Sequence, residues 1–116
     1  MLVFPNAKIN LGLYITSKRA DGYHDLETLF LPIASKEALE IVPAEDGITT
    51  MTTFGLPIQG DAQNNLVWKA WQLIATAYPE KVYPIKIILQ KAIPMGAGLG
   101  GGSADGAFML RLLNAY

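Results

Sequence analysis

Residues 94–105 read Pro-Met-Gly-Ala-Gly-Leu-Gly-Gly-Gly-Ser-Ala-Asp, and five of these twelve residues are glycine. An apolar run, 85–90, precedes this stretch, and a helix-forming run, 107–113, follows it. The pattern predicts a glycine loop between a strand and a helix. Glycines permit positive φ and close backbone approach, while the first turn of a helix offers unpaired N–H groups and a partial positive charge. The loop is therefore expected to bind an anion, most often a phosphate.

Two general phosphate-binding motifs fit this loop in part. Gly96, Gly98 and Gly101 satisfy the dinucleotide fingerprint G-x-G-x-x-G, which also requires an acidic residue about 20 positions further on. The sequence ends before that position, so this requirement stays open. Residues 96–103 fit the Walker A pattern G-x-x-x-x-G-K-[ST], except that Gly102 stands at the lysine position. A turn without a ligand is a further interpretation, which the folding cost of so many glycines disfavours.

The composition is that of one globular domain. The 116 residues are 51% hydrophobic and 16% charged, with a formal net charge of −1, no cysteine and one histidine. The balanced charge argues against a nucleic-acid or anionic membrane partner. The lack of cysteine excludes disulfides and thiolate metal sites. Residues 1–5 have no signal-peptide features and no apolar stretch reaches the length of a membrane span, so a soluble, cytoplasmic protein is expected.

Strict alternation of apolar and polar residues over 7–16 predicts a half-buried strand. Its polar face includes Lys8 and Asn10, which would project side by side. For Lys8, spacing alone favours an ordinary solvent-facing lysine.

The dipeptide Asp21-Gly22 predicts a hairpin that brings Tyr23 and His24 near Asn10 and Gly12. An exposed aromatic residue beside a histidine suits stacking on a nucleobase, although packing over the turn fits the pattern equally well.

The remaining patterns complete the expected order of elements. Helical spacing of apolar residues predicts a helix from Asn64 or Asn65 to Tyr78, in which Trp68 and Trp71 serve packing. Further strands are expected over 26–33, 38–42, 48–54 and 85–90. Because strands come mostly first, the class is α+β, with helices on one face of a mixed sheet. This order differs from the alternating βαβαβ of a dinucleotide-binding domain.

Three stretches together, 7–13, 19–24 and 94–105, resemble the GHMP kinases, and among these the branch of the non-mevalonate isoprenoid pathway. The loop of this superfamily has the general form P-x-x-x-G-L-G-S-S-A, and this chain carries glycine where many members carry serine. The resemblance implies the fold of the GHMP kinase N-terminal domain, which is similar to domain 2 of ribosomal protein S5. It also implies ATP and Mg²⁺ as cofactors and transfer of the γ-phosphoryl group to the 2-hydroxyl of a methylerythritol moiety linked to cytidine diphosphate.

The same resemblance assigns roles to individual residues. Lys8 would be the catalytic lysine near the accepting hydroxyl, and Asn10 would bind the methylerythritol end. Tyr23 and His24 would bind the cytidine, and Asn65 and Lys91 are candidates for contacts to the adenosine part of ATP. The ATP phosphates would be held by Pro94, Met95, Gly96, Ala97, Gly98, Leu99, Gly100, Gly101, Gly102, Ser103 and Ala104. The hydroxyl of Ser103 would contact phosphate or Mg²⁺.

One family feature has no counterpart in these residues. The catalytic aspartate of the family lies beyond the glycine-loop helix, and Asp105 belongs to the loop motif instead. Residues 1–116 are therefore expected to be a truncated kinase, an ATP-binding N-terminal domain without its C-terminal domain and inactive alone. Its unpartnered helix 107–113 would favour self-association. A stand-alone nucleotide- or phosphate-binding module and a fragment of an NAD-dependent oxidoreductase are the alternatives.

Overall fold

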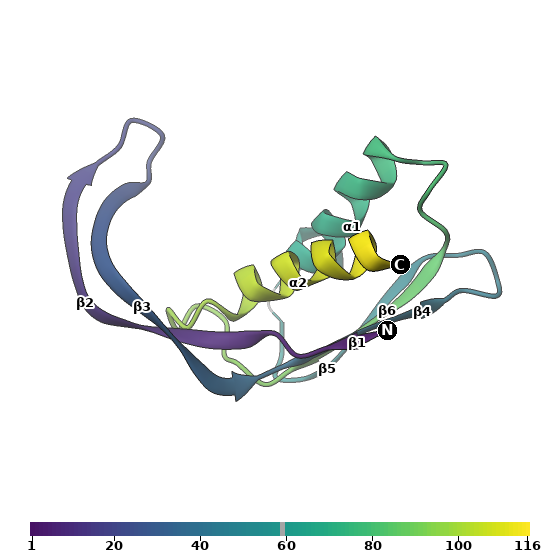
Figure 1. Ribbon diagram of the computed structural model, residues 1–116, viewed down its shortest axis with the longest axis horizontal. Coiled ribbons are helices and arrows are strands. Elements are labelled where there is room, and N and C mark those ends of the chain that lie inside the picture. The colour runs from purple at the N-terminus through teal and green to yellow at the C-terminus, as the bar shows by residue number, and fades with distance from the viewer. Residues whose placement is uncertain (59) are drawn as a thin grey trace.

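The computed structural model describes residues 1–58 and 60–116. Two helices lie on one face of a sheet, and a long two-stranded ribbon extends to one side (Figure 1). The elements are β1 (Leu2–Val3), β2 (Asn6–Lys18), β3 (His24–Lys36), β4 (Ala38–Pro43), β5 (Thr50–Gly55), the short 3-10 helix η1 (Ala62–Asn64), α1 (Leu66–Ala77), β6 (Ile85–Lys91) and α2 (Gly101–Ala115). The predicted strands and helices are all present, and only β1 and η1 were not expected.

The four-stranded sheet has the order β1-β4-β6-β5. β6 pairs antiparallel with β4 and parallel with β5, so the sheet is mixed, as predicted. A parallel pair needs a crossover connection, and α1 provides it between β5 and β6. The α+β class is confirmed, and the described residues contain one βαβ unit rather than the repeated units of a dinucleotide-binding domain.

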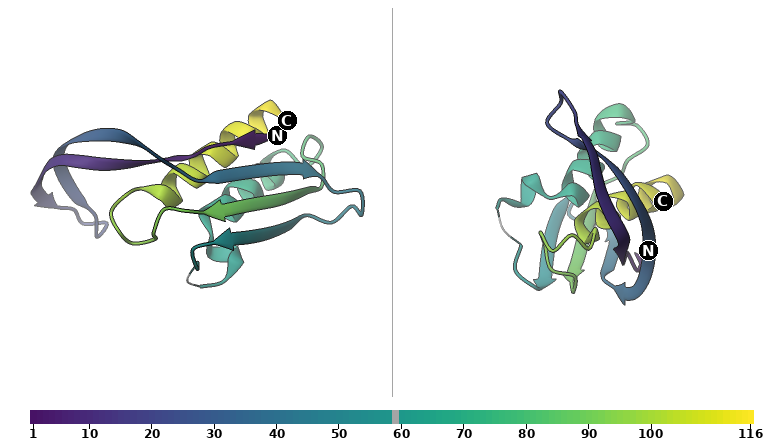
Figure 2. Two further views of the ribbon diagram at one scale, coloured as in Figure 1. Left: turned by 90° about the horizontal axis from the view of Figure 1, so that it is seen from below. Right: turned by 90° about the vertical axis from the view of Figure 1, so that its left-hand side faces the viewer.

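Alternation along β4 and β6 decides where the core lies. Ile85, Ile87 and Leu89 occupy the inward positions of β6 and are at most 1% exposed. Both helices pack on this side of the sheet, as Figure 2 shows. The buried core cluster consists of Leu39, Ile41, Val67, Ala70, Ile85, Ile87, Leu89, Met109 and Leu112. Each fully buried aliphatic side chain of this kind stabilises the fold by about 1.5–3 kcal/mol.

The predicted hairpin forms, but as a ribbon separate from the sheet. β2 and β3 pair only with each other among the described strands, and their outer part extends beyond the helices and bends toward the side of the sheet that the helices cover (Figure 1). The prediction of a half-buried strand is wrong there, since Leu11, Leu13 and Ile15 are 48–64% exposed. A period of two shows which side chains share a face of a strand, but it does not show whether that face is covered.

α1 begins where the sequence predicts. Asn65 is its N-cap, and the side-chain oxygen of Asn65 accepts a hydrogen bond from the N–H of Val67 at 2.8 Å. Trp68 and Trp71 pack against the core with their ring centroids 4.7 Å apart, which confirms a packing role.

α2 begins earlier than the predicted range 107–113, at Gly101 inside the glycine run. Low helix propensity is overridden here by close packing. A Cβ at Gly101 would lie 2.8 Å from a carboxylate oxygen of Glu37, and a Cβ at Gly106 would lie 3.1 Å from the Cβ of Leu66. In the described part of the chain, neither this helix nor α1 is long and apolar enough to cross a membrane.

Gly55, at the end of β5, should be intolerant of any side chain. Its φ is +84°, and a Cβ would collide with the backbone carbonyl oxygen of Lys91. Gly55→Ala should therefore lower the free energy of unfolding by about 2–4 kcal/mol in urea denaturation, because backbone strain and overpacking add. Gly47→Ala is a matched control, since Gly47 has φ +71° but open space around it and should cost only about 1–2 kcal/mol. Equal losses in the two variants would contradict the collision.

Candidate functional site

The glycine loop, residues 94–100, connects β6 to α2 beside a hollow of about 230 Å³. Gly96, Gly98 and Gly100 have φ of +74°, +72° and +73°, whereas the residues between them have negative φ. Alternating negative and positive φ is the backbone pattern of anion-binding nests, and glycine adopts it at little cost. The hollow is lined by Leu66, Pro94, Met95, Gly96, Gly98, Leu99, Gly100, Gly101, Gly102 and Ser103. Of the predicted loop residues, only Ala97 and Ala104 are not part of this lining.

The first turn of α2 presents free backbone donors to the same hollow. Gly100 is the N-cap and has no side chain that could cap the helix. The N–H of Ala104 already bonds to the carbonyl oxygen of Gly100 at 3.0 Å. The N–H groups of Gly101, Gly102 and Ser103 therefore precede the first helical hydrogen bond and have no partner within the helix. This end of the helix carries a partial positive charge, which favours an anion.

Gly102 has no structural requirement for glycine. It is the second residue of α2 and has no positive φ, and a Cβ there would meet no described atom within 4 Å. Glycine in a helix interior costs about 1 kcal/mol relative to alanine, which is an upper value for a residue in the first turn. The open space beside this backbone is thus maintained at a cost to the fold, which is consistent with the close approach of a ligand.

Lys8 reaches across the loop from β2. Its backbone N–H donates to the carbonyl oxygen of Leu99 at 2.9 Å, and its ammonium donates to the carbonyl oxygen of Gly98 at 2.7 Å. The ammonium also donates to Oδ1 of Asn10 at 2.6 Å. A Cβ at Gly100 would lie 3.2 Å from the aliphatic part of Lys8, so the side chain lies directly along the loop. The structure therefore brings Lys8 and Asn10 to the glycine loop and supplies the charge that Gly102 lacks.

The orientation of the Asn10 amide follows from a chain of hydrogen bonds. The hydroxyl of Thr28 donates its single proton to the carbonyl oxygen of Gly12 at 2.6 Å, so it must accept from Nδ2 of Asn10 at 2.9 Å. This arrangement leaves Oδ1 for Lys8. The ring of Phe30 lies 5.0 Å from the Lys8 ammonium. Thr28 and Phe30 were not predicted, because they become neighbours of Asn10 and Lys8 only through the strand register.

Tyr23 and His24 lie at the far end of the ribbon. His24 pairs with Lys18, so the prediction that it lies near Asn10 and Gly12 is wrong. The eight positions from Asn10 to Lys18 correspond to about 26 Å of strand. The reason is that the turn at Asp21-Gly22 is tight, so the residues directly after it lie opposite those directly before it, whereas Asn10 pairs with Phe30. Tyr23 is 74% exposed, and its predicted contact with cytidine stays a prediction.

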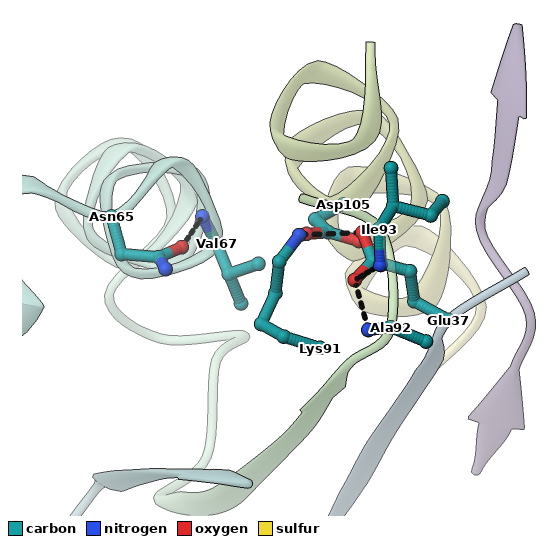
Figure 3. Close-up of polar contacts among 7 residues, drawn as sticks. All are labelled: Glu37, Asn65, Val67, Lys91, Ala92, Ile93 and Asp105. Carbon is teal, nitrogen blue, oxygen red and sulfur yellow. Dashed lines mark hydrogen bonds and ion pairs between the residues drawn. The ribbon is translucent and has the colours of Figure 1, made fainter. Parts of the chain in front are cut away.

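Lys91 is not placed for the predicted contact with adenosine. Its side chain is buried, and its ammonium lies 2.5 Å from Oε1 of Glu37 and 2.9 Å from Oδ2 of Asp105 (Figure 3). Burial disfavours its charge, but the hydrogen bonds with Glu37 and Asp105 outweigh this effect and raise the pKa of Lys91. The ammonium is thus already paired inside the protein and is not available for the predicted contact with adenosine.

Asp105 has a strongly altered acidity. Burial raises the pKa of its carboxyl group to about 6, although the hydrogen bond from Lys91 acts in the opposite direction. The nearby carboxylate of Glu37 adds to the increase. Asp105 Oδ1 is buried without a hydrogen-bond partner among the described residues. No sequence signal marked Glu37, which joins β3 to β4 and is 2% exposed.

The remaining predicted residues lie around the hollow or beside it. Asn65 immediately precedes Leu66, a lining residue, but its side-chain oxygen is used to cap α1. Ser103 is exposed on the first turn of α2. Within the described residues, no group of three or more His, Cys, Asp or Glu side chains could hold a metal ion.

Comparisons with known proteins agree with this geometry. Residues 65–116 match the family of GHMP kinases, N-terminal domain. The whole chain is 53% identical to part of the 4-diphosphocytidyl-2-C-methyl-D-erythritol kinases of Parabacteroides distasonis and Bacteroides thetaiotaomicron, and it spans 41% and 42% of their lengths. A crystal structure of 4-(cytidine 5'-diphospho)-2C-methyl-D-erythritol kinase aligns with a TM-score of 0.78 and 37% identity, over 99% of this chain and 40% of that one.

The mixed sheet, the two covering helices and the glycine loop give this chain the fold of a GHMP kinase N-terminal domain, the family that residues 65–116 match. Within that class, the chain is similar over its full length to 4-diphosphocytidyl-2-C-methyl-D-erythritol kinases.

Proposed function

We propose that residues 1–116 are the ATP-binding domain of a 4-diphosphocytidyl-2-C-methyl-D-erythritol kinase. Such an enzyme transfers the γ-phosphoryl group of ATP to the 2-hydroxyl of its acceptor. The observation that carries the proposal is the hollow beside the glycine loop, which is lined by the first residues of α2 with their unpaired N–H groups. The Lys8 side chain is bonded to the same loop. The similarity to named kinases along the whole chain supports the choice of substrate class.

The loop would contribute to phosphoryl transfer by positioning and by compensating charge. Backbone N–H groups of 98–102 would hold the ATP phosphates, since they bind an anion without a side-chain charge. Lys8 would exchange its bond with the carbonyl oxygen of Gly98 for one with the transferred group or the accepting oxygen. Ser103 is the one hydroxyl of the hollow lining and would contact phosphate or Mg²⁺. The Mg²⁺ ion would neutralise phosphate charge and keep part of its water shell.

The acceptor would lie along the ribbon. Asn10 is fixed beside Lys8 and would bind the methylerythritol end, while Tyr23 and His24 at the tip would bind the cytidine. A cytidine diphosphate acceptor is shorter than the strand between these positions, so this placement would require the tip to lie closer than the strand length. The bend of the ribbon in Figure 1 is in keeping with this requirement.

The direct test is titration of Mg-ATP into the chain by calorimetry, with NAD as the competitor and Gly100→Val as the control variant. Saturable binding of ATP that the variant loses is expected, because valine at φ +73° would disrupt the loop. Preference for NAD would favour the oxidoreductase alternative. Absence of any nucleotide binding would reject the proposal.

A second test concerns the transfer itself. A full-length kinase that contains this chain should release ADP from Mg-ATP in the presence of 4-diphosphocytidyl-2-C-methyl-D-erythritol. Residues 1–116 alone should not, because loss of one group of a catalytic set typically costs orders of magnitude in rate. Binding of ATP without transfer by the full-length protein would favour a nucleotide-binding module. Transfer by residues 1–116 at a comparable rate would contradict our assignment of catalytic roles.

Tyr23→Ala should weaken acceptor binding and leave ATP binding nearly unchanged. Stacking of an aromatic side chain on a base contributes about 1–3 kcal/mol, so the acceptor KM of the full-length kinase should rise roughly tenfold to a hundredfold. Tyr14→Ala is the matched control, since Tyr14 is 72% exposed on the same ribbon but away from the tip. An acceptor KM that responds to neither substitution would place the cytidine elsewhere.

A further inference from the structure

Three charged side chains meet in the interior of the protein next to the glycine loop. Glu37, Lys91 and Asp105 are each 2–3% exposed. They come from three separate segments: the junction between β3 and β4, the last residue of β6, and the second turn of α2. None of them has a part in the proposed binding of ATP or the acceptor.

The cluster ties both ends of the glycine loop to one carboxylate. Oε2 of Glu37 accepts hydrogen bonds from the N–H groups of Ala92 and Ile93, at 2.8 and 3.1 Å, where the chain enters the loop. Oε1 of Glu37 accepts from the Lys91 ammonium, which also donates to Asp105 on the helix that leaves the loop. Figure 3 shows these contacts as one continuous network between β6 and α2.

Stability alone does not account for this cluster. Buried ion pairs are expensive to desolvate, and well-packed apolar residues often stabilise a fold as much or more. Oδ1 of Asp105 adds to that cost, because it is buried without a hydrogen bond from any described residue. Charged hydrogen bonds fix the direction and the distance between the segments that they join, whereas apolar contacts do not.

The network also touches the start of α2 directly. A Cβ at Gly101 would lie 2.8 Å from Oε1 of Glu37 and 3.0 Å from a methyl group of Ile93. The first helical residue therefore lies next to the Glu37 carboxylate, which also accepts the hydrogen bonds from Ala92 and Ile93 where the chain enters the loop. A change in the position of Glu37 would displace the N–H groups of Gly101 and its neighbours.

We propose that Glu37, Lys91 and Asp105 form a positioning network for the glycine loop. The network fixes the separation of the end of β6 and the start of α2, and thereby the directions in which the loop N–H groups point. The three residues act through the loop and do not touch the nucleotide. The effect on ATP rests on the proposed function of the loop as its phosphate site, whereas the effect on loop geometry does not.

The test compares substitutions of Asp105 that keep or remove its acceptor oxygen. Asp105→Asn retains an oxygen for Lys91 and preserves volume, whereas Asp105→Leu removes the oxygen and keeps the same branching in a larger side chain. Two quantities are measured at a temperature at which every variant is fully folded: the amide NMR shifts of Gly96, Gly98, Gly100 and Gly102, and the Kd for Mg-ATP. Asp105→Leu should move the glycine resonances and raise Kd about tenfold or more. Asp105→Asn should leave both close to those of the unmodified protein.

A cluster that serves stability alone would lower the melting temperature of Asp105→Leu without changing the glycine resonances or Kd, and that result would overturn the proposal. If Asp105→Leu does not fold, Asp105→Ala provides the same comparison, since alanine has high helix propensity and leaves the Lys91–Glu37 pair in place. If the unmodified chain binds no ATP, the proposed function fails, but the glycine resonances still decide whether the network positions the loop.

Discussion

Replacing Gly102 with alanine should change stability and nucleotide binding in opposite directions. The free energy of unfolding should rise by up to about 1 kcal/mol, because alanine is the better helix former and its methyl group meets no described atom within 4 Å. The Kd for Mg-ATP should rise roughly tenfold to a hundredfold, because the methyl group would occupy space needed for a phosphate and overpacking costs about 1–3 kcal/mol. Urea denaturation and calorimetric titration of the same preparation measure the two effects.

Ala107→Gly is the matched control for this experiment. Ala107 is an exposed residue of the same helix and lies outside the hollow. Its replacement by glycine should reduce stability by about 1 kcal/mol and leave the ATP affinity unchanged. If Gly102→Ala stabilised the protein without weakening ATP binding, the open space at Gly102 would have no connection with a nucleotide.

The second large effect concerns Asp105 and pH. Its folded-state pKa is about 6, above the ordinary value of 3.8, so the folded protein retains this proton over a range in which the unfolded chain has lost it. A raised carboxyl pKa means that stability falls as pH increases through this interval. Lys91 and Glu37 are the charged groups that face Asp105. Lys91 lowers the pKa of Asp105 and Glu37 raises it, and the folded-state value of about 6 includes both effects.

We therefore expect the stability of Asp105→Asn relative to the unmodified protein to increase between about pH 4 and pH 7, by on the order of 1–3 kcal/mol. Urea denaturation at several pH values measures it. Asp46→Asn is the control, and its stability relative to the unmodified protein should change with pH in the opposite direction. The reason is that the hydrogen bond with Lys86 lowers the pKa of the exposed Asp46. The stabilisation from Asp46 is present above its ordinary pKa and is lost as pH falls. A pH-independent difference for Asp105→Asn would mean that this carboxyl group titrates normally.

Several elements of the fold were predictable because local patterns encode them. The glycine run, the Asn65 cap and the Asp21-Gly22 turn each depend on residues within a few positions of one another. The mixed sheet followed from the order of these elements. Similarity of three stretches to the GHMP kinases then indicated the class of domain.

The buried charges could be predicted only in part. Lys91 follows Ile85, Ile87 and Leu89 in the inward positions of β6, so the alternation does indicate a lysine that needs a buried partner. Its partner Glu37 lies 54 positions away, and no local pattern connects the two. The exposure of the outer ribbon was missed for a related reason, since coverage of a face depends on segments that are remote in sequence.

The two bonds from Lys8 to the loop have a consequence for the orientation of individual peptide units. In a trans peptide the carbonyl group of one residue and the N–H of the next point in opposite directions. Because the carbonyl oxygens of Gly98 and Leu99 both point to Lys8, the N–H groups of Leu99 and Gly100 must point away from it. Lys8 thus determines the direction in which two consecutive peptide units point. One of its two bonds to the loop comes from its backbone N–H, and this bond would persist after any substitution of Lys8 except proline.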